Sequence, residues 1–343
     1  MKYSKYGIHR VIEPVGILPQ AAKKLDNTPI CHPNEMLIEV DTLNIDSASF
    51  HQIKEACSND IEKMKTMILD IVTKQGKMQN PVTKSGGMLI GKVKDVGEKF
   101  HDQSIEINTK IATLVSLSLT PLYIDEILSI NLSNEQVKIK GDAILFDSGI
   151  YAVIPDDLDE KLVLASLDVA GAPAQVKNLA KDGDTVFIIG AAGKSGLLCA
   201  YQAKKQVGPY GKVIGLVNEE AQKTLLKSLN LYDKIILEDA KDAIKVHEQI
   251  STITLHQLAD LTINCVNIEN TEMTSILSTK DQGTVYFFSM ATSFTKAALG
   301  AEGVGKDITM IIGNGYTKSH AETTLNIMRE SKALHDLFMK RYA

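Results

Sequence analysis

Residues 182–218 read DGDTVFIIGAAGKSGLLCAYQAKKQVGPYGKVIGLVN. An apolar, β-branched run at 185–189 precedes a glycine turn, and a helical pattern then continues to Gly208. A second apolar run follows at 212–217. Apolar runs of this length indicate buried strands, and glycine followed by proline ends a helix. The segment therefore predicts a β–α–β unit of about thirty residues.

The turn of this unit has the pattern G-x-x-G-x-x-G, with glycines at 190, 193 and 196. A pyrophosphate binds such a turn by approaching the backbone, accepting hydrogen bonds from free N–H groups and lying at the positive end of a helix. A glycine turn without a nucleotide is the structural alternative. The surrounding β–α–β pattern favours a dinucleotide. The expected contacts of the pyrophosphate at the turn are Gly190, Ala191, Ala192, Gly193, Lys194 and Ser195.

Other cofactor contacts are expected where strands end, because ligands of a parallel sheet bind at the carboxyl ends of its strands. Asn218 follows the second strand, on the side of the adenosine ribose. Val266, Asn267 and Ser289 follow later strands and should border the nicotinamide ribose. No carboxylate directly follows Val217 to bind the ribose of NAD, and no arginine is near to bind the 2′-phosphate of NADP. These residues leave the choice between the two cofactors open. We expect NAD or NADP, with NAD slightly preferred.

Composition narrows the class of protein. The chain has 343 residues, 44% of them hydrophobic and 23% charged, which is ordinary for one or two globular domains. The net charge of -5 argues against a nucleic-acid partner. No apolar run of about eighteen residues is present to cross a membrane. The four cysteines are far apart and form no C-x-x-C pair, so a cytoplasmic location with free thiols is expected.

The rest of the chain separates into two kinds of pattern. Residues 1–155 look β-rich, with alternating runs at 35–45 and 88–96, an apolar run at 110–119 and a helical stripe within 49–73. After residue 155, strands alternate with helices, which implies a doubly wound parallel sheet. The further strands are expected at 234–237, 261–266, 283–289 and 307–312, and a final helical stretch at 321–342.

Three segments resemble the medium-chain dehydrogenase/reductase superfamily. Residues 44–51 (NIDSASFH) lie where that family carries N-x-C-G-(S/T)-D-x-H. Residues 86–93 (GGMLIGKV) lie where it carries G-H-E-x-x-G-x-V, and residues 165–171 (ASLDVAG) match its helix before the nucleotide fold. The resemblance implies an α/β protein: a β-rich, GroES-like catalytic domain at 1–155 and 325–343, and a Rossmann dinucleotide-binding domain at 156–324. It also suggests a homodimer or homotetramer, paired through sheet edges around 283–312.

The departures from the family pattern are informative. The family holds a catalytic zinc with a cysteine, the histidine of G-H-E and a third ligand in the bridging helix. The matching positions here are Asp46, Gly87 and Val169. Glycine and valine side chains cannot bind a metal, and a catalytic zinc needs three protein ligands. We therefore expect a zinc-independent member with no metal.

Three segments narrow the resemblance further: GAAGKSGLLCAYQAKK from Gly190, DSASFHQI from Asp46 and VNIENTEM from Val266. They are similar to the superfamily's amine dehydrogenases of anaerobic lysine fermentation. This resemblance implies NAD(P)-dependent, reversible oxidative deamination of a small diamino acid. Zinc-free quinone or enoyl reductases of the same superfamily are one alternative, and a non-catalytic binding protein with a dehydrogenase-like fold is another.

Three residues are candidates for the proton chemistry that such a reaction needs. Asp46 replaces the zinc cysteine and could bind a cationic substrate and accept its proton; alternatively it caps a helix. His51 could relay a proton or be a packing remnant. Asp168 lies in the bridging helix near the lost zinc position and could be catalytic or a solvated acid.

Overall fold

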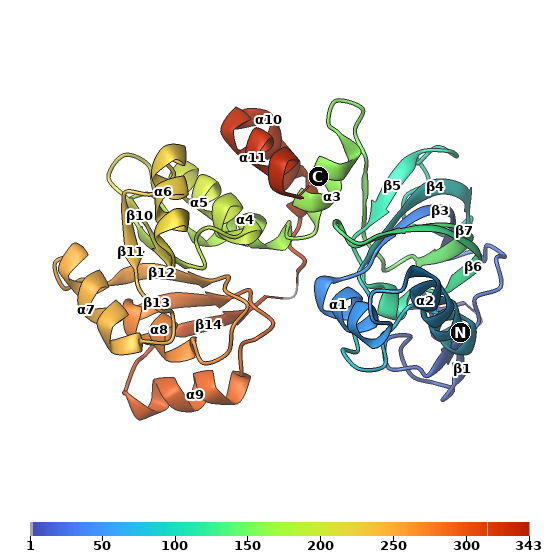
Figure 1. The fold of residues 1–343 in the computed structure, drawn as a ribbon, viewed down its shortest axis with the longest axis horizontal. Coiled ribbons are helices and arrows are strands. Elements are labelled where there is room, and N and C mark those ends of the chain that lie inside the picture. The colour runs from blue at the N-terminus through green and yellow to red at the C-terminus, as the bar shows by residue number, and fades with distance from the viewer. Residues whose placement is uncertain (1–2, 314, 343) are drawn as a thin grey trace. The chain divides into compact units, whose positions relative to one another are not determined.

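A computed structural model describes residues 3–313 and 315–342 of the chain. These residues form two compact units, Met1–Glu160 and Lys161–Ala343 (Figure 1). The first unit is built around an antiparallel sheet and the second around a parallel one.

The sheet of the first unit has the strand order β6-β7-β3-β4-β5-β8, and all of its pairs are antiparallel. Two helices, α1 and α2, follow β3 and precede β4. A short pair, β1 and β2, and two single turns of 3₁₀-helix, η1 and η2, complete the unit. The bounds are η1 Ile8–Arg10, β1 Val11–Glu13, β2 Lys24–Leu25, β3 Glu35–Asn44, α1 Ser47–Ala56, α2 Ile61–Gln75, β4 Met88–Val96, β5 Lys110–Thr113, η2 Leu117–Leu119, β6 Leu122–Asn131, β7 Gln136–Phe146 and β8 Tyr151–Val153.

Local sequence explains the two helices. Helix α2 buries Met64, Ile68 and Ile71 along one stripe, as the helical spacing predicts. Asp60 caps its start by accepting the amides of Glu62 and Lys63, at 3.0 and 3.2 Å. The apolar run at 110–119 forms a strand only to 113, and η2 follows. Strands β6 and β7 were not individually predicted, because β6 is exposed at most positions and so lacks a continuous apolar pattern.

The sheet of the second unit is parallel throughout, with the order β11-β10-β9-β12-β13-β14. Helices α5 and α6 cover one face, and α7, α8 and α9 cover the other (Figure 1). The chain changes face between β9 and β12, which is where doubly wound sheets bind ligands. The bounds are α3 Glu160–Leu167, α4 Gly171–Leu179, β9 Thr185–Ile189, α5 Lys194–Val207, β10 Lys212–Val217, α6 Glu220–Leu229, β11 Lys234–Leu237, α7 Ala243–Ile253, β12 Ala259–Asn264, α8 Glu272–Ser278, β13 Thr279–Phe287, α9 Phe294–Gly303, β14 Thr309–Ile312, α10 His320–Glu330 and α11 Lys332–Tyr342.

The α/β class, the β-rich first part and the doubly wound sheet are confirmed. The C-terminal helices differ from the expected assignment of 325–343 to the first domain, because the compact unit that contains them is the second. Helix α10 packs against α4 and α5. Its Glu330 pairs with Lys205 at 2.6 Å and accepts a hydrogen bond from Tyr201 at 3.2 Å, both on α5.

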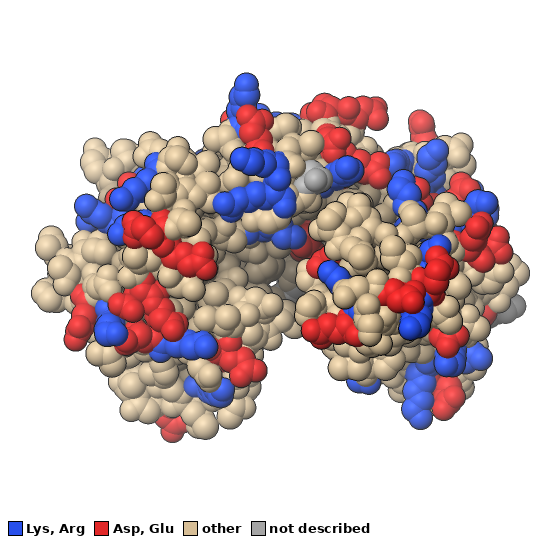
Figure 2. Space-filling model, viewed as in Figure 1, with Lys and Arg blue, Asp and Glu red and all other residues tan. Residues whose placement is uncertain are grey.

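Acidic and basic side chains are mixed over the visible face of each unit (Figure 2). Neither sign of charge forms a large uniform field on that face. Within residues 3–313 and 315–342, no helix combines the length and apolar character required to cross a membrane.

A buried ion pair fixes the start of the first unit. Glu35, fully buried at the start of β3, accepts hydrogen bonds from Arg10 Nη2 at 2.7 Å and Arg10 Nε at 2.9 Å. His9 Nε2 lies 2.7 Å from the same carboxylate, and the amide of His32 donates to it at 2.9 Å. Burial alone would raise the pKa of Glu35, but the hydrogen bonds from Arg10 and His9 outweigh it and lower the pKa to about 2.

We expect Glu35→Gln to lower the free energy of unfolding by about 3–5 kcal/mol, because it leaves Arg10 buried without its partner. The native pair should stabilise the unit fully above the ordinary carboxyl pKa of 4.5 and lose that effect as the pH falls toward 2. Urea unfolding at pH 7 and at lower pH measures both effects. Glu13→Gln, whose exposed carboxylate lies 3.6 Å from Lys23, is the control and should change little. Equal stability of the two variants at pH 7 would contradict a stabilising role for the buried Arg10–Glu35 pair.

Candidate functional site

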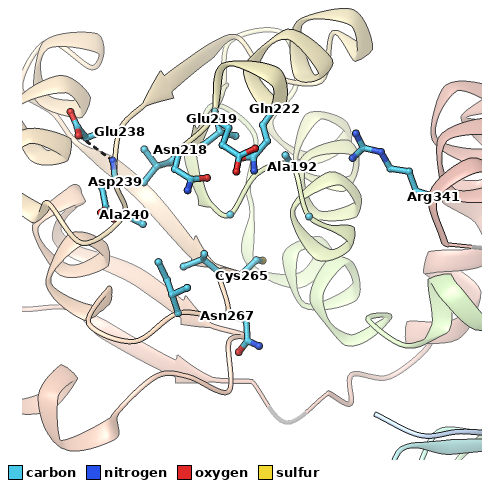
Figure 3. A pocket seen from close by; sticks show the side chains of 16 residues that line it. Ala192, Asn218, Glu219, Gln222, Glu238, Asp239, Ala240, Cys265, Asn267 and Arg341 are labelled. Carbon is cyan, nitrogen blue, oxygen red and sulfur yellow. Dashed lines mark hydrogen bonds between the residues drawn. The ribbon is translucent and has the colours of Figure 1, made fainter. Parts of the chain in front are cut away.

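A cavity of about 530 Å³ lies in the second unit, at the carboxyl ends of β9, β10, β11 and β12 (Figure 3). Its volume is in the range of small-molecule sites. Six of the ten predicted cofactor residues line it: Gly190, Ala192, Gly193, Asn218, Val266 and Asn267. The structure thus brings together residues that follow three different strands. The other four, Ala191, Lys194, Ser195 and Ser289, are not among its lining residues.

Close backbone contacts explain two of the three glycines. Gly190 has a φ of 82°, and a Cβ there would lie 2.9 Å from the amide nitrogen of Val266. A Cβ on Gly196 would lie 2.3 Å from the carbonyl oxygen of Gly190. Gly193 is different, because a Cβ there meets only the Gly190 carbonyl, at 3.5 Å. The protein itself therefore needs glycine at 190 and 196 but not at 193, and Gly193 lines the cavity.

The amides of the turn divide into occupied and available donors. Ala191 N donates to Leu216 O at 3.1 Å, and Gly193 N donates to Gly190 O at 3.2 Å. Ala191 is fully buried, and its amide joins the turn to β10. Helix α5 starts at Lys194, and its amides at 194–196 belong to the first turn, where no carbonyl lies four residues earlier in the helix. These amides and the helix dipole form a fitting site for a pyrophosphate.

Tyr232 holds the turn from beneath, and the sequence patterns did not identify it. Its hydroxyl lies 2.9 Å from Ala191 O and 3.0 Å from Gly196 O. Burial raises the pKa of Tyr232 well above its ordinary value, so the hydroxyl keeps its proton and stays a donor. Only the parallel pairing of β10 with β11 places residue 232 under the turn, which no local pattern indicates.

Lys194 and Asp168, predicted in separate roles, form one ion pair. The Lys194 Nζ lies 2.5 Å from Asp168 Oδ2, and both side chains are partly exposed. The same Nζ lies 5.6 Å from the ring centre of Tyr342. Lys194 is thus drawn toward Asp168 and α11. Ser289 is also occupied, since its amide donates to Asn264 O and its hydroxyl accepts from the amide of Ala291.

The cavity contains charged residues that the sequence analysis did not assign. Glu219 follows Asn218, and Glu238 and Asp239 follow β11 (Figure 3). Arg341 extends from α11 toward the side of the cavity that holds Ala192 (Figure 3). Arg341 lies more than 70 residues along the chain from every other lining residue, so its part in the cavity depends on how α10 and α11 pack. Glu238 and Asp239 could have been identified as cavity residues from the sequence, because they directly follow a predicted strand.

Asp46 belongs to a polar cluster in the first unit. Its Oδ1 caps α1 by accepting the amide of Ser49 at 3.0 Å, as the structural alternative expected. The hydroxyl of Ser85 donates to the same Oδ1 at 2.9 Å. Oδ2 is buried and has no hydrogen-bond partner within the described residues. A buried carboxylate oxygen without a donor is costly, and a cationic or N–H ligand would satisfy it.

Gly87 lies against the backbone next to Asp46. Its φ is 101°, and a Cβ there would lie 2.1 Å from Asn44 O and 2.7 Å from Asp46 N. A histidine therefore has no room at the position where zinc-dependent relatives carry one. Among residues 3–313 and 315–342, no group of three or more His, Cys, Asp or Glu side chains is arranged to hold a metal ion. The residues present do not fit a catalytic zinc.

His51 does not join this cluster. It lies on α1 with its side chain 69% exposed, and its Nε2 is 3.1 Å from Glu55 Oε1 one turn later. The three predicted catalytic residues thus occupy three separate surroundings: the hydroxyl cluster, an exposed helical pair and the ion pair with Lys194.

Comparisons with known proteins agree with this geometry. Residues 9–155 match the family described as L-erythro-3,5-diaminohexanoate dehydrogenase N-terminal domain. The chain is 57% identical over 343 residues to the L-erythro-3,5-diaminohexanoate dehydrogenase of Acetoanaerobium sticklandii, covering 100% of both chains. It is 56% identical over 342 residues to the enzyme of that name from Fusobacterium nucleatum subsp. nucleatum, covering 99% of both.

Solved structures share the fold at low identity. The quinone oxidoreductase of Coxiella burnetii is 18% identical, with a TM-score of 0.55 over 92% of this chain and 90% of that one. A mycobacterial protein solved in complex with NADPH is 18% identical, with a TM-score of 0.55 over 97% and 88%. The medium-chain dehydrogenase/reductase fold is therefore confirmed, and the full-length identities above show that the chain belongs to the L-erythro-3,5-diaminohexanoate dehydrogenase family.

Proposed function

We propose that the chain catalyses the reversible, NAD(P)-dependent oxidative deamination of L-erythro-3,5-diaminohexanoate to 5-amino-3-oxohexanoate and ammonia, a reaction of lysine fermentation. The observation that carries this proposal is the full-length identity to two enzymes of that name. The substrate is thus a small diamino acid. The bound nicotinamide accepts the hydride, and the residues of this chain bind the cofactor and handle the protons.

The cavity of the second unit supports dinucleotide binding. The amides at 194–196 and the open backbone at Gly193 suit the pyrophosphate. Arg341 adds a positive charge on the same side of the cavity (Figure 3). Val266 and Asn267 lie beside the turn and suit the nicotinamide ribose, while Asn218 suits the adenosine ribose.

We assign NAD as the preferred cofactor. Glu219, Glu238 and Asp239 are lining residues of the cavity, as Asn218 is, and the Glu238 carboxylate accepts the amide of Asp239 at 3.1 Å (Figure 3). Carboxylates accept the ribose hydroxyls of NAD, whereas they repel the 2′-phosphate of NADP. Lys194 and Ser195 remain proposed contacts of the pyrophosphate through their amides, and Ser289 a proposed neighbour of the nicotinamide.

Asp46 is the proposed proton acceptor. A 3-ammonium group must lose a proton before hydride can leave the same carbon, and Asp46 Oδ2 has the unused acceptor capacity to take it. The close packing around Gly87 supports a reaction without zinc, because it leaves no room for a metal-binding histidine at this position. His51 and Asp168 stay proposed participants; in the structure His51 pairs with Glu55, and Asp168 pairs with Lys194.

We also propose a homodimer or homotetramer that pairs through the edge of the parallel sheet. Strand β14 ends this sheet, and its Ile312 is 57% exposed. An exposed edge strand presents unpaired backbone groups to a second copy. The four cysteines have free thiols, which fits a reducing compartment, and we propose the cytoplasm.

The proposed function is tested by following absorbance at 340 nm with a panel of β-amino and diamino acids, with NAD and NADP in separate reactions. Turnover of the 3,5-diamino acid, faster with NAD, is the expected result. Quinone or enoyl reduction without amine oxidation would identify a reductase instead. Failure to bind any nicotinamide cofactor by calorimetry would identify a non-catalytic protein.

Gly193→Ala should weaken NAD binding about tenfold or more while the melting temperature stays unchanged. The added methyl group meets no protein atom closer than 3.5 Å, but it obstructs the approach of a phosphate to the turn amides, whose bonds to a charged group are strong. Calorimetric titration measures the affinity.

Two matched glycine variants control this experiment. Gly303→Ala, on α9 with no atom within 4 Å of its Cβ, should change neither affinity nor stability. Gly196→Ala should lower stability, because its Cβ lies 2.3 Å from Gly190 O. Unchanged NAD affinity in the folded Gly193 variant would remove this turn from the cofactor site.

Asp46→Asn should reduce turnover by about 10²–10⁴-fold, since the amide cannot accept the substrate proton. Cofactor affinity should barely change, because the cavity lies in the other unit. Steady-state kinetics and calorimetry on one preparation measure both. Asp70→Asn, an exposed acid paired with Lys74 at 3.5 Å on α2, is the control and should keep full activity. Retained turnover in the Asp46 variant would exclude Asp46 from the mechanism.

A further inference from the structure

Three hydroxyl groups lie together beside Asp46. Ser85 Oγ is 2.9 Å from Asp46 Oδ1, 2.9 Å from Ser49 Oγ and 3.0 Å from Thr83 Oγ1. Ser49 Oγ and Thr83 Oγ1 are 2.7 Å apart. Ser49 is fully buried, and Thr83 is half-buried.

The direction of the hydrogen bonds follows from counting protons. An ionised carboxylate can only accept, so Ser85 uses its single hydroxyl proton on Asp46 Oδ1. Ser85 Oγ then accepts from the hydroxyl of Ser49. In a consistent arrangement each hydroxyl donates once: Thr83 donates to Ser49, Ser49 donates to Ser85, and Ser85 donates to Asp46. The cluster therefore directs one donor at one oxygen of Asp46.

The segment that carries Thr83 and Ser85 is fixed to α1. Asn80 Oδ1 accepts the amides of Val82 and Thr83, at 2.8 and 3.2 Å. Asn80 Nδ2 donates to Gln52 Oε1 at 2.8 Å. The hydroxyl of Ser85 is thus held at a set place relative to Asp46, which caps the same helix.

The helix cap alone would leave the carboxylate plane loosely defined. The terminal torsion of an aspartate is broad and roughly two-fold, so its two oxygens can exchange places under a single donor. The amide of Ser49 and the hydroxyl of Ser85 together give Oδ1 two donors, while Oδ2 has none among the residues that the structure describes. The second donor makes the two oxygens inequivalent and orients the carboxylate.

We propose that Ser85 is the positioning residue of Asp46: it engages Oδ1, with Ser49 and Thr83 orienting its proton, and leaves Oδ2 to take the proton of the substrate ammonium group. This inference rests on the proposed function. In that reaction the N–H bond of the ammonium breaks and its proton passes to Oδ2. The hydride passes to NAD(P)⁺, and water then replaces the nitrogen, which takes up a proton and leaves as the ammonium ion. One net proton is released to solvent.

The test is Ser85→Ala, with Ser85→Thr as the conservative variant. We expect Ser85→Ala to lower kcat about 10- to 100-fold with little change in KM. The acid limb of its pH profile for kcat/KM should move to higher pH, because a carboxylate with fewer donors holds its proton more tightly. Ser85→Thr keeps the hydroxyl and should restore most of kcat and the position of the limb.

Ser104→Ala is the matched control. Ser104 donates to Asp102 Oδ1 at 2.6 Å on the surface of the same unit, so it loses an equivalent bond away from Asp46. It should leave kcat and the pH profile unchanged. Ser85→Ala introduced into Asp46→Asn should cause no further loss, because the two residues act as one unit.

The outcomes separate this inference from the proposed function. If the wild type deaminates the substrate, Asp46→Asn is inactive and Ser85→Ala keeps both kcat and the acid limb, the positioning role is wrong and the proposed function stands. A lowered melting temperature with an unmoved pH profile would likewise reduce Ser85 to a structural residue. An inactive wild type would overturn the proposed function itself. An Asp46→Asn variant with wild-type turnover would exclude Asp46 from the mechanism, and the positioning role of Ser85 with it.

Discussion

The close approach of two backbone segments at the glycine turn determines the architecture of the second unit. The Cα of Gly196 packs so near the Gly190 carbonyl that no side chain fits, and Gly190 in turn packs closely on the segment after β12. These contacts join β9 to α5 and to the end of β12, the strand beside β9 at which the chain changes face. Tyr232 fixes the turn with bonds to two of its carbonyls. Gly190, Ala192 and Gly193 of this turn line a cavity, so the packing that builds the fold also builds the proposed cofactor site.

A second close approach, in the first unit, underlies the proposed chemistry. Gly87 lies against the Asn44 carbonyl and the Asp46 amide, where a histidine would collide. The same backbone segment places Asp46 at the start of α1, with one oxygen engaged and the other without a donor. A metal polarises a substrate and lowers the pKa of its bound groups. Here an oriented carboxylate is proposed to accept the proton directly, which suits an ammonium substrate that already carries positive charge.

Much of this could be predicted from the sequence, because it rests on local patterns. The strand, glycine turn and helix at 185–207 are encoded in a continuous segment, and so are the ends of the strands that line the cavity. The loss of the zinc ligands followed from single positions at 46 and 87. Arg341, Tyr232 and the hydroxyls around Asp46 could not be predicted, because each reaches its place through long-range packing or through a loop without periodicity. Lys194 and Asp168 were each predicted as site residues in separate roles, but the ion pair between them was not predicted.

The central claim is that a carboxylate, and not a bound metal, supports proton transfer in this family member. The most direct measurement combines metal analysis with turnover of the 3,5-diamino acid. Purified enzyme is dialysed against a strong chelator, its metal content is measured by mass spectrometry, and its rate of NADH formation is compared before and after. We predict that full turnover persists with far less than one metal ion per chain and that added zinc does not increase it. Activity that falls with the removal of zinc and returns with its addition would contradict the account.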